Sequence, residues 1–185
     1  NIAGVYAIGD CAQQTELTGL RRPIEAVWYT GRMMGETLAQ TICGNKTAYK
    51  PGHWFNSAKF FEVEYQTYGW VNTDKRKQEH EQHFHWQHPH EPIAITAAYH
   101  KETNQLLGVN VFGIRLRHAV LDAWLSQHKS LDYCLAHWAD ALFDPEFSNS
   151  HQKDLLNHYN TVFQKALKPV KKSWTRIFNL FSTKK

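Results

Sequence analysis

VYAIGDCA, residues 5–12, is the stretch that decides the fold class of this 185-residue chain. It begins with apolar residues that predict a short strand, which would place Gly9 and Asp10 at its carboxyl end. Ligands of open α/β sheets bind at the carboxyl ends of strands. Glycine there lets a bound group approach the backbone closely, and an aspartate can accept hydrogen bonds from sugar-like hydroxyls. The stretch therefore predicts a cofactor-binding turn.

A helix is expected soon after this turn. Pro23 suits a first helical turn, where its missing N–H costs nothing, and Gly44 suits the position after a last turn. Apolar residues between them recur with the period of a helix: Ile24, Val27, Trp28, Met34, Leu38 and Ile42. Gly31 and Gly35 lie on the same stripe, where each would cost about 1 kcal/mol relative to alanine in an exposed helix. We therefore expect another backbone or a cofactor to approach them closely.

This strand, turn and helix resemble the second flavin-binding signature of the pyridine nucleotide-disulfide oxidoreductases, which reads aromatic-Ala-apolar-Gly-Asp and then a small residue or Cys. The resemblance implies that residues 1–49 end an FAD-binding Rossmann-like domain and that Gly9 and Asp10 bind FAD. In that family the helix N-terminus points at the pyrimidine edge of the flavin. Its charge of about +0.5 can stabilise negative charge on the reduced ring. The flavin-binding residues implied there are Pro23, Ile24 and Val27.

The signature occurs late in members of that family but begins at residue 5 here, and the first residue is Asn. The chain is therefore interpreted as the C-terminal portion of a larger enzyme, with the missing N-terminal domains as its partners. It contains no Gly-x-Gly-x-x-Gly fingerprint of the kind that binds adenine dinucleotides. We expect the isolated chain neither to retain FAD tightly nor to turn over.

After Lys50-Pro51-Gly52 the pattern changes to strands followed by helices. Strands are expected over residues 61–71 and 83–86, a hairpin over 93–99 and 106–112, and helices over 116–125 and 131–142, with Ser130 as an N-cap. Strands that precede helices predict an α+β domain, in which an antiparallel sheet is covered by helices on one face. We assign residues 50–145 to this domain.

This order resembles the C-terminal, dimerising domain of the ferredoxin-reductase and apoptosis-inducing-factor branch of the family. The domain opens there with a Trp-Phe-Trp-Ser-type motif, and His53-Trp54-Phe55-Asn56-Ser57 occupies that place here. The resemblance implies that Trp54 contacts the flavin, with simple core or interface packing as the alternative. Asn56 departs from the pattern, because it replaces the second Trp.

The implied parent enzyme takes hydride from NADH or NADPH and passes electrons through FAD to an acceptor. The glutathione-reductase branch carries a His-Pro-Thr motif, whereas His88-Pro89 is followed here by His90. This difference favours transfer from flavin to acceptor over dithiol reduction, and no catalytic residue is predicted in this chain. The alternative function, from another class, is a non-catalytic module for dimerisation or membrane docking.

Residues 146–185 are expected to form a helical, amphipathic tail. An apolar stripe over residues 155–167 predicts a helix that ends near Lys168-Pro169. Residues 170–185 continue an apolar face flanked by lysine and arginine, which could lie on an anionic membrane surface. The same face could pack on the missing domains or on a second subunit in a homodimer. Packing is favoured, because amphipathic helices of globular proteins are far more common.

Composition argues against several other classes of protein. The formal charge of +4 is not concentrated in a basic stripe, so no nucleic-acid partner is predicted. Three cysteines far apart in the sequence indicate no disulfide framework and favour a cytoplasmic location. The basic, apolar face of residues 170–185 leaves a peripheral membrane location as the alternative. Cys11 is expected to pack as a small buried residue rather than to act as a redox thiol.

A cluster of histidines is the densest group of ionisable residues in the sequence: His80, His83, His85, His88 and His90. Histidines at alternate positions of a strand share a face and could bind zinc, copper or nickel. The polar residues and prolines among them instead favour an exposed segment that responds to pH. No metal site is therefore predicted.

Overall fold

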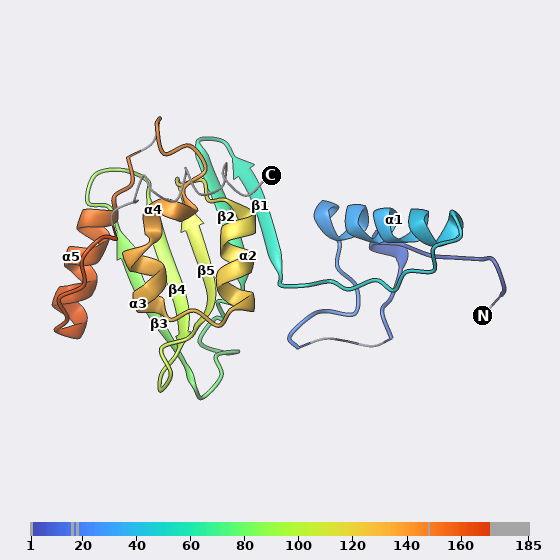
Figure 1. Ribbon diagram of the computed structural model, residues 1–185, viewed down its shortest axis with the longest axis horizontal. Helices are drawn as coiled ribbons and strands as arrows, with labels where there is room; N and C mark the ends of the chain where they lie inside the picture. The colour runs from blue at the N-terminus through green and yellow to red at the C-terminus, as the bar shows by residue number, and fades with distance from the viewer. Residues whose placement is uncertain (1, 16, 18, 148, 171–185) are drawn as a thin grey trace, which may run out of the picture.

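The structure, a computed structural model, describes residues 2–15, 17, 19–147 and 149–170. It has two lobes joined by an extended stretch of chain (Figure 1). The N-terminal lobe carries a short 3-10 helix, η1 (Gly9–Cys11), and a long helix, α1 (Trp28–Ile42). The larger lobe is built on a sheet with helices packed against it.

The strand predicted before Gly9 is absent. Residues 5–8 have no regular secondary structure, and Ile8 is extended with φ −139° and ψ 163°. A strand is stabilised by hydrogen bonds to a neighbouring strand, and none pairs with this segment within the described residues. Of the predicted strand and helix, only the helix forms, so a Rossmann-like end is not confirmed.

Helix α1 begins later than Pro23. Val27 is its N-cap, with φ −133° and ψ 130°. The preceding residues form a tight turn instead, in which the Val27 N–H donates to the Glu25 carbonyl oxygen at 2.9 Å. The predicted end is confirmed, because Gly44 adopts φ +90° and its N–H donates to the Thr41 carbonyl oxygen at 3.1 Å.

The sheet has five antiparallel strands in the order β1-β2-β5-β4-β3. Their bounds are β1 Phe55–Phe60, β2 Val63–Gly69, β3 Glu81–Gln87, β4 Ala94–His100 and β5 Leu106–Phe112. The predicted strand 83–86 is β3, and the predicted hairpin is β4 and β5. The strand predicted over 61–71 is β2. Strand β1 was not predicted, and it is joined to β2 by a turn in which Phe61 has φ +52°.

Two backbones pass very close to each other where β2 pairs with β5. Gly69 lies opposite Gly108, and its φ is +63°. A Cβ at Gly69 would overlap the Leu107 carbonyl oxygen, and a Cβ at Gly108 would overlap the backbone of Trp70. This crossing therefore requires glycine in both strands.

Helices cover one face of the sheet (Figure 1). They are α2 (His118–Ser126), α3 (Leu131–Ala136) and α4 (Trp138–Ala141), and α5 (Gln152–Phe163) packs beside α3 and β3. The core lies between these helices and the strands, where Ile95, Val111 and Leu121 are at most 1% exposed. The antiparallel sheet covered by helices confirms the predicted α+β class.

The predicted helices differ from the observed ones mainly in their limits. The predicted 131–142 helix is interrupted at His137, which separates α3 from α4. Leu116, predicted in the preceding helix, forms a β-bridge with Leu142 instead. Ser130 is the N-cap of α3 as predicted, because the Tyr133 N–H donates to its Oγ at 3.2 Å.

The predicted tail is described only as far as Val170. Helix α5 ends at Phe163, and Gln164 follows with φ +51°. Residues 171–185, which include most of the proposed membrane-binding face, lie outside the described residues. In the part of the chain that is described, no helix has both the length and the apolar character needed to cross a membrane.

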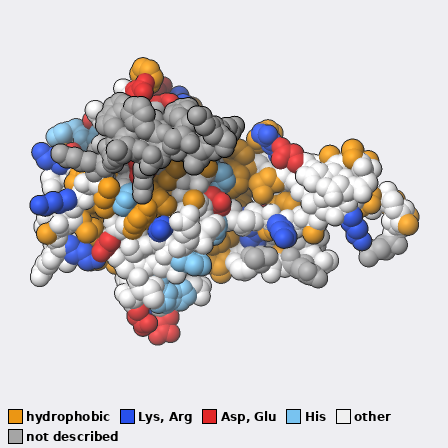
Figure 2. Space-filling view, in the orientation of Figure 1, with side chains coloured by type: hydrophobic (Ala, Val, Ile, Leu, Met, Phe, Trp, Pro, Cys, Tyr) orange, Lys and Arg blue, Asp and Glu red, His pale blue; other side chains and the backbone are white. Residues whose placement is uncertain are grey.

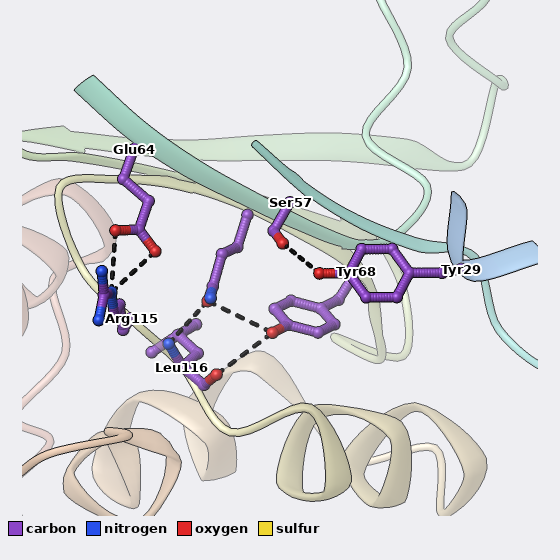
Figure 3. Close-up of polar contacts among 7 residues, drawn as sticks. Tyr29, Ser57, Glu64, Tyr68, Arg115 and Leu116 are labelled. Carbon is purple, nitrogen blue, oxygen red and sulfur yellow. Dashed lines mark hydrogen bonds and ion pairs between the residues drawn. The ribbon is translucent and has the colours of Figure 1, made fainter. Parts of the chain in front are cut away.

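Side chains hold the two lobes together. The Tyr29 hydroxyl of α1 lies 2.8 Å from Ser57 Oγ of β1 (Figure 3), and the Tyr29 ring lies 5.0 Å from that of Phe55. On the connecting stretch, His53 Nδ1 lies 2.9 Å from Asp122 Oδ1 of α2. These contacts fix the N-terminal end of α1 against the sheet.

Candidate flavin-binding site

Gly9 lies against α1 at close range. A Cβ added at Gly31 would lie 3.7 Å from Gly9 Cα, and one at Gly35 would lie 3.8 Å from Ile8 Cδ1. Gly9 has φ +76°, and its N–H lies 3.3 Å from Met34 Sδ. The backbone approach expected at these glycines is found at Gly31, whereas Gly35 faces the Ile8 side chain.

Asp10 is exposed on η1 and has no hydrogen bond or ion pair with another described residue. Its carboxylate oxygens are therefore free to accept hydrogen bonds from a ligand. Cys11 is exposed as well, so its predicted burial is wrong, because no described segment covers this side of η1. The buried thiol is instead Cys134, in the core of the larger lobe.

No side chain caps the N-terminus of α1. Val27 provides no side-chain cap, and the first turn contains no acidic residue. The free N–H groups and the positive end of the helix dipole therefore remain available to an electron-rich group. Pro23 and Ile24, predicted as first-turn residues, lie before the helix and are exposed, whereas Val27 sits at its start.

A buried ion pair holds the segment before α1. Arg21 Nη1 lies 2.6 Å from Glu25 Oε2, and the two side chains are 5% and 2% exposed. The Thr30 hydroxyl donates to the same Glu25 oxygen at 3.2 Å. Arg21 Nη2 donates to the carbonyl oxygens of Pro51 and Gly52, at 2.8 and 3.1 Å. We call this group of residues the Arg21 clamp, and it ties the start of α1 to the stretch between the lobes.

Trp54 belongs to the same region. Its ring stacks on Trp70 with a centroid distance of 5.7 Å, and the Arg21 guanidinium carbon lies 5.7 Å from its centroid. These contacts fit the packing alternative for Trp54. Among the described residues, no hydrogen bond, ion pair or ring contact joins Trp54 to Asp10. The structure therefore brings Gly9 to α1, and Trp54 to the Arg21 clamp, without joining the two groups.

Arg21 and Glu25 were not predicted as site residues. Their signal in the sequence is an opposite-charge pair four residues apart, which on a helix would indicate an ordinary surface ion pair. They lie before the helix, and both are buried. Burial of this pair depends on the carbonyl groups of residues 51–52, which are distant in the sequence.

A large open hollow adjoins η1 and α1. Its volume is about 680 Å³, and its lining includes Ile8, Met34 and Tyr49. Burial raises the pKa of the Tyr49 phenol, and the hydroxyl has no hydrogen-bond partner in the described structure. The amide nitrogen of Gln14 is also buried without one. Such buried polar groups are usually paired, so these two atoms are exceptions among the residues that line the hollow.

The N-terminal lobe exposes many large apolar side chains, several of which are visible in Figure 2. They are Ile2, Val5, Tyr6, Ile8, Leu17, Leu20, Ile24, Trp28 and Ile42. Trp28, in the first turn of α1, is 68% exposed. Apolar surface on this scale marks a region that contacts another molecule or another part of a protein.

The histidine cluster is divided between β3 and its flanking loops. His83 and His85 are on the strand, where His83 Nε2 lies 2.6 Å from Glu81 Oε1 and His85 Nδ1 lies 2.9 Å from Thr96 Oγ1. Across the described residues, no three His, Cys, Asp or Glu side chains are grouped so that they could hold a metal ion.

Comparison with known proteins identifies similar structures but no similar sequences. No family model matches the sequence, and no curated protein matches it. A NAD-dependent persulfide reductase from A. fulgidus is 17% identical with a TM-score of 0.56, and the match covers 85% of this chain and 32% of that one. A FAD-dependent pyridine nucleotide-disulfide oxidoreductase from Desulfovibrio vulgaris is 14% identical with a TM-score of 0.54, covering 81% and 38%.

CoADR-RHD of Bacillus anthracis is 20% identical with a TM-score of 0.52, and the match covers 71% of this chain and 26% of that one. The chain thus spans between a quarter and two fifths of the length of these structures. Its five-stranded antiparallel sheet and helices are consistent with their C-terminal domain. Over the matched residues, the chain shares the fold of part of these three structures.

Proposed function

We propose that this chain is the C-terminal part of a FAD-dependent NAD(P)H oxidoreductase. In this proposal residues 1–49 complete the FAD-binding domain, residues 50–145 form the C-terminal domain, and residues 146–185 form the tail. FAD, when bound, supplies the hydride and electron transfer from NAD(P)H to an acceptor. The chain's own residues bind and orient one side of the flavin, and the isolated chain is inactive.

The observation that carries the proposal is the position of η1 on α1. A Cβ at Gly31 would lie 3.7 Å from Gly9 Cα, so the turn packs directly on the backbone of α1 at this point. This packing keeps Asp10 exposed beside a helix whose first turn has neither a side-chain cap nor an acidic residue. A sugar-like chain of hydroxyls and an electron-rich ring edge are the groups that these two features suit.

The residues present fit FAD in their chemistry. Asp10 would accept hydrogen bonds from the ribitol or the neighbouring part of the cofactor, and the start of α1, at Val27, would face the ring. Pro23 and Ile24 would contribute exposed surface near that helix end. Trp54 would act through the Arg21 clamp, because its contacts are with Arg21 and Trp70.

The exposed apolar side chains of the N-terminal lobe support a larger parent protein. The matched structures extend well beyond the length that this chain covers. A remaining FAD domain would cover Val5, Tyr6 and Trp28, which are at least 57% exposed here. At about 25 cal/mol per Å² of apolar surface, covering such residues is favourable.

Two measurements test the proposal. The reading frame upstream of Asn1 should encode two Gly-rich βαβ fingerprints, and their absence would overturn the assignment. The protein made from the complete reading frame should contain flavin, and Asp10→Ala should weaken FAD binding by about tenfold, the effect of losing a hydrogen bond to a charged group. Asp74→Ala, at another exposed aspartate, is the matched control.

The isolated 185-residue chain gives an independent test. We expect it to purify without flavin, because its sequence lacks the Gly-x-Gly-x-x-Gly fingerprint that binds the dinucleotide. Stoichiometric FAD in the isolated chain would contradict the proposed division of the site between this chain and other domains.

A further inference from the structure

A second hollow lies where α1 meets the larger lobe, and we call it the junction pocket. Its volume is about 270 Å³, just below the ~300–1,000 Å³ of pockets for drug-sized ligands. It therefore suits a ligand with one ring rather than a dinucleotide. Rings form much of its lining: Tyr29, Phe55, Tyr68, His118 and Phe143.

The rings of the junction pocket come from both lobes. Tyr29 is on α1, whereas Phe55 and Tyr68 are on β1 and β2 (Figure 3 shows both tyrosines). The His118 ring lies 4.1 Å from the Phe55 centroid and 5.8 Å from the Tyr68 centroid. Aromatic side chains arranged in this way favour a planar aromatic ligand, which can pack on ring faces and edges.

Some hydrogen-bond donors of the junction pocket have no partner in the described structure. Tyr29 and Ser57 share one hydrogen bond of 2.8 Å, which uses only one of their two hydroxyl protons. Gln66 Oε1 accepts from the Leu116 N–H at 2.7 Å, which fixes the orientation of the amide. The Gln66 amide nitrogen then has no partner among the described residues.

The Tyr68 hydroxyl donates one hydrogen bond within the protein and stays protonated, while its oxygen accepts none from the described residues. Burial raises the pKa of Tyr68 to about 12, so the phenol is neutral near pH 7. Its proton is directed to Gln66 Oε1 or to the Leu116 carbonyl oxygen, each 3.3 Å away. The Tyr29–Ser57 pair and the Gln66 amide nitrogen therefore leave donors that a ligand could use.

One charged side chain of the junction pocket is a guanidinium with donors left over. Arg115 lines it and no carboxylate does. Arg115 Nε donates to both oxygens of Glu64, at 2.9 and 2.8 Å, and its two Nη groups have no partner in the described structure (Figure 3). The Arg115 side chain is 58% exposed, so this ion pair is weakly held. A guanidinium with free Nη groups beside hydroxyl donors suits a carboxylate.

We propose that the junction pocket binds a small aromatic carboxylate, with its ring among Tyr29, Tyr68 and His118 and its carboxylate between Arg115 and the Ser57 hydroxyl. The pocket is formed entirely by described residues of this chain. The proposal does not depend on flavin binding at η1, so either can fail without the other.

The test is calorimetric titration of the 185-residue chain with benzoate, benzamide and acetate. Benzoate should bind saturably, and benzamide, which keeps the ring but lacks the charge, should bind about tenfold more weakly. Acetate, which lacks the ring, should bind at least as weakly as benzamide. Ser57→Ala should weaken benzoate binding by several fold, because it removes the hydroxyl donor placed at the carboxylate.

Arg115→Gln should reduce the affinity for benzoate to that for benzamide. Arg117→Gln, two residues away, exposed and outside the pocket lining, is the matched control and should leave binding unchanged. A circular dichroism spectrum identical to that of the parent chain verifies the fold of each variant. No saturation by benzoate, equal affinities for benzoate and benzamide, or equal losses in the Arg115 and Arg117 variants would each overturn the proposal.

Discussion

Glu81 is a buried carboxylate at the start of β3 whose hydrogen bonds make the stability of the sheet depend on pH. Its side chain is 2% exposed and accepts from the Asn72 backbone N–H at 3.0 Å, the Asn72 amide at 2.7 Å and His83 Nε2 at 2.6 Å. Burial by itself would raise the pKa of Glu81, but these hydrogen bonds outweigh it and hold the pKa below its usual value.

A carboxyl group whose pKa is lowered in the folded state stabilises the protein at pH values above its ordinary pKa of about 4.3. That stabilisation is lost as the pH falls through the lowered folded value. We expect Glu81→Gln to lower the unfolding free energy by about 1–3 kcal/mol at pH 7. Between pH 7 and pH 3, the unfolding free energy of this variant should fall less than that of the parent chain. Urea unfolding at pH 7 and at pH 3 measures both. Glu79→Gln, at an exposed neighbour, should follow the parent chain.

The hydroxyl of Ser130 caps α3, so its removal leaves a first-turn N–H without a partner. We expect Ser130→Ala to lower the unfolding free energy by about 1 kcal/mol. Ser126→Ala, at the exposed end of α2, is the control and should change it by less than about 0.5 kcal/mol. Equal effects of the two substitutions would show that the cap contributes nothing.

At the scale of elements, the packing of η1 on α1 depends on the size of residue 31. A methyl group there would meet Gly9 Cα at 3.7 Å, an ordinary contact, so Gly31→Ala should keep the packing and gain up to about 1 kcal/mol from helix propensity. Gly31→Leu should displace η1. The amide resonance of Gly9 in two-dimensional NMR spectra reports the difference: it should stay near its position in the alanine variant and shift strongly in the leucine variant.

The sequence predicted those elements whose apolar spacing is regular. The strand β3 alternates between apolar and polar residues, and the hairpin of β4 and β5 follows from the polar turn residues between its two arms. The Gly44 stop and the Ser130 cap follow from local backbone chemistry. Strand β1 was missed because Phe55 and Phe60 are five residues apart, so they point to opposite faces and break the alternation. Residues 5–8 have the apolar pattern of a strand, but a strand also needs a neighbouring strand to pair with. A local sequence pattern does not show whether that neighbour exists.

Only the part of the candidate site that is local in sequence was predictable. Gly9, Asp10 and the helix after them are near in sequence, and their juxtaposition followed from the motif and the glycine spacing. The contacts of Arg21 with residues 51–52, and of Tyr29 with Ser57, join segments about 30 residues apart. Such contacts depend on how the lobes meet, and neither pair has a signature in the sequence.

At the scale of the whole molecule, the Arg21 clamp couples the lobes. Arg21→Met would leave the Glu25 charge buried without its partner, which typically costs about 3–5 kcal/mol. We therefore expect amide hydrogen exchange over residues 50–54 to accelerate strongly. The double substitution Arg21→Met with Glu25→Gln should be less destabilising than Arg21→Met alone, because no unpaired charge remains. Additive losses would argue against coupling. Arg22→Met, at an exposed neighbour, is the control.

The close crossing of β2 and β5 has a consequence for tracing the ancestry of this chain. Gly69 and Gly108 leave no room for a Cβ, so a relative that keeps this crossing must keep both glycines even when almost every other position has changed. At identities of 14% to 20%, ordinary alignment loses register. The two glycines provide fixed points, 39 positions apart in the numbering of this chain, from which distant members can be placed in register.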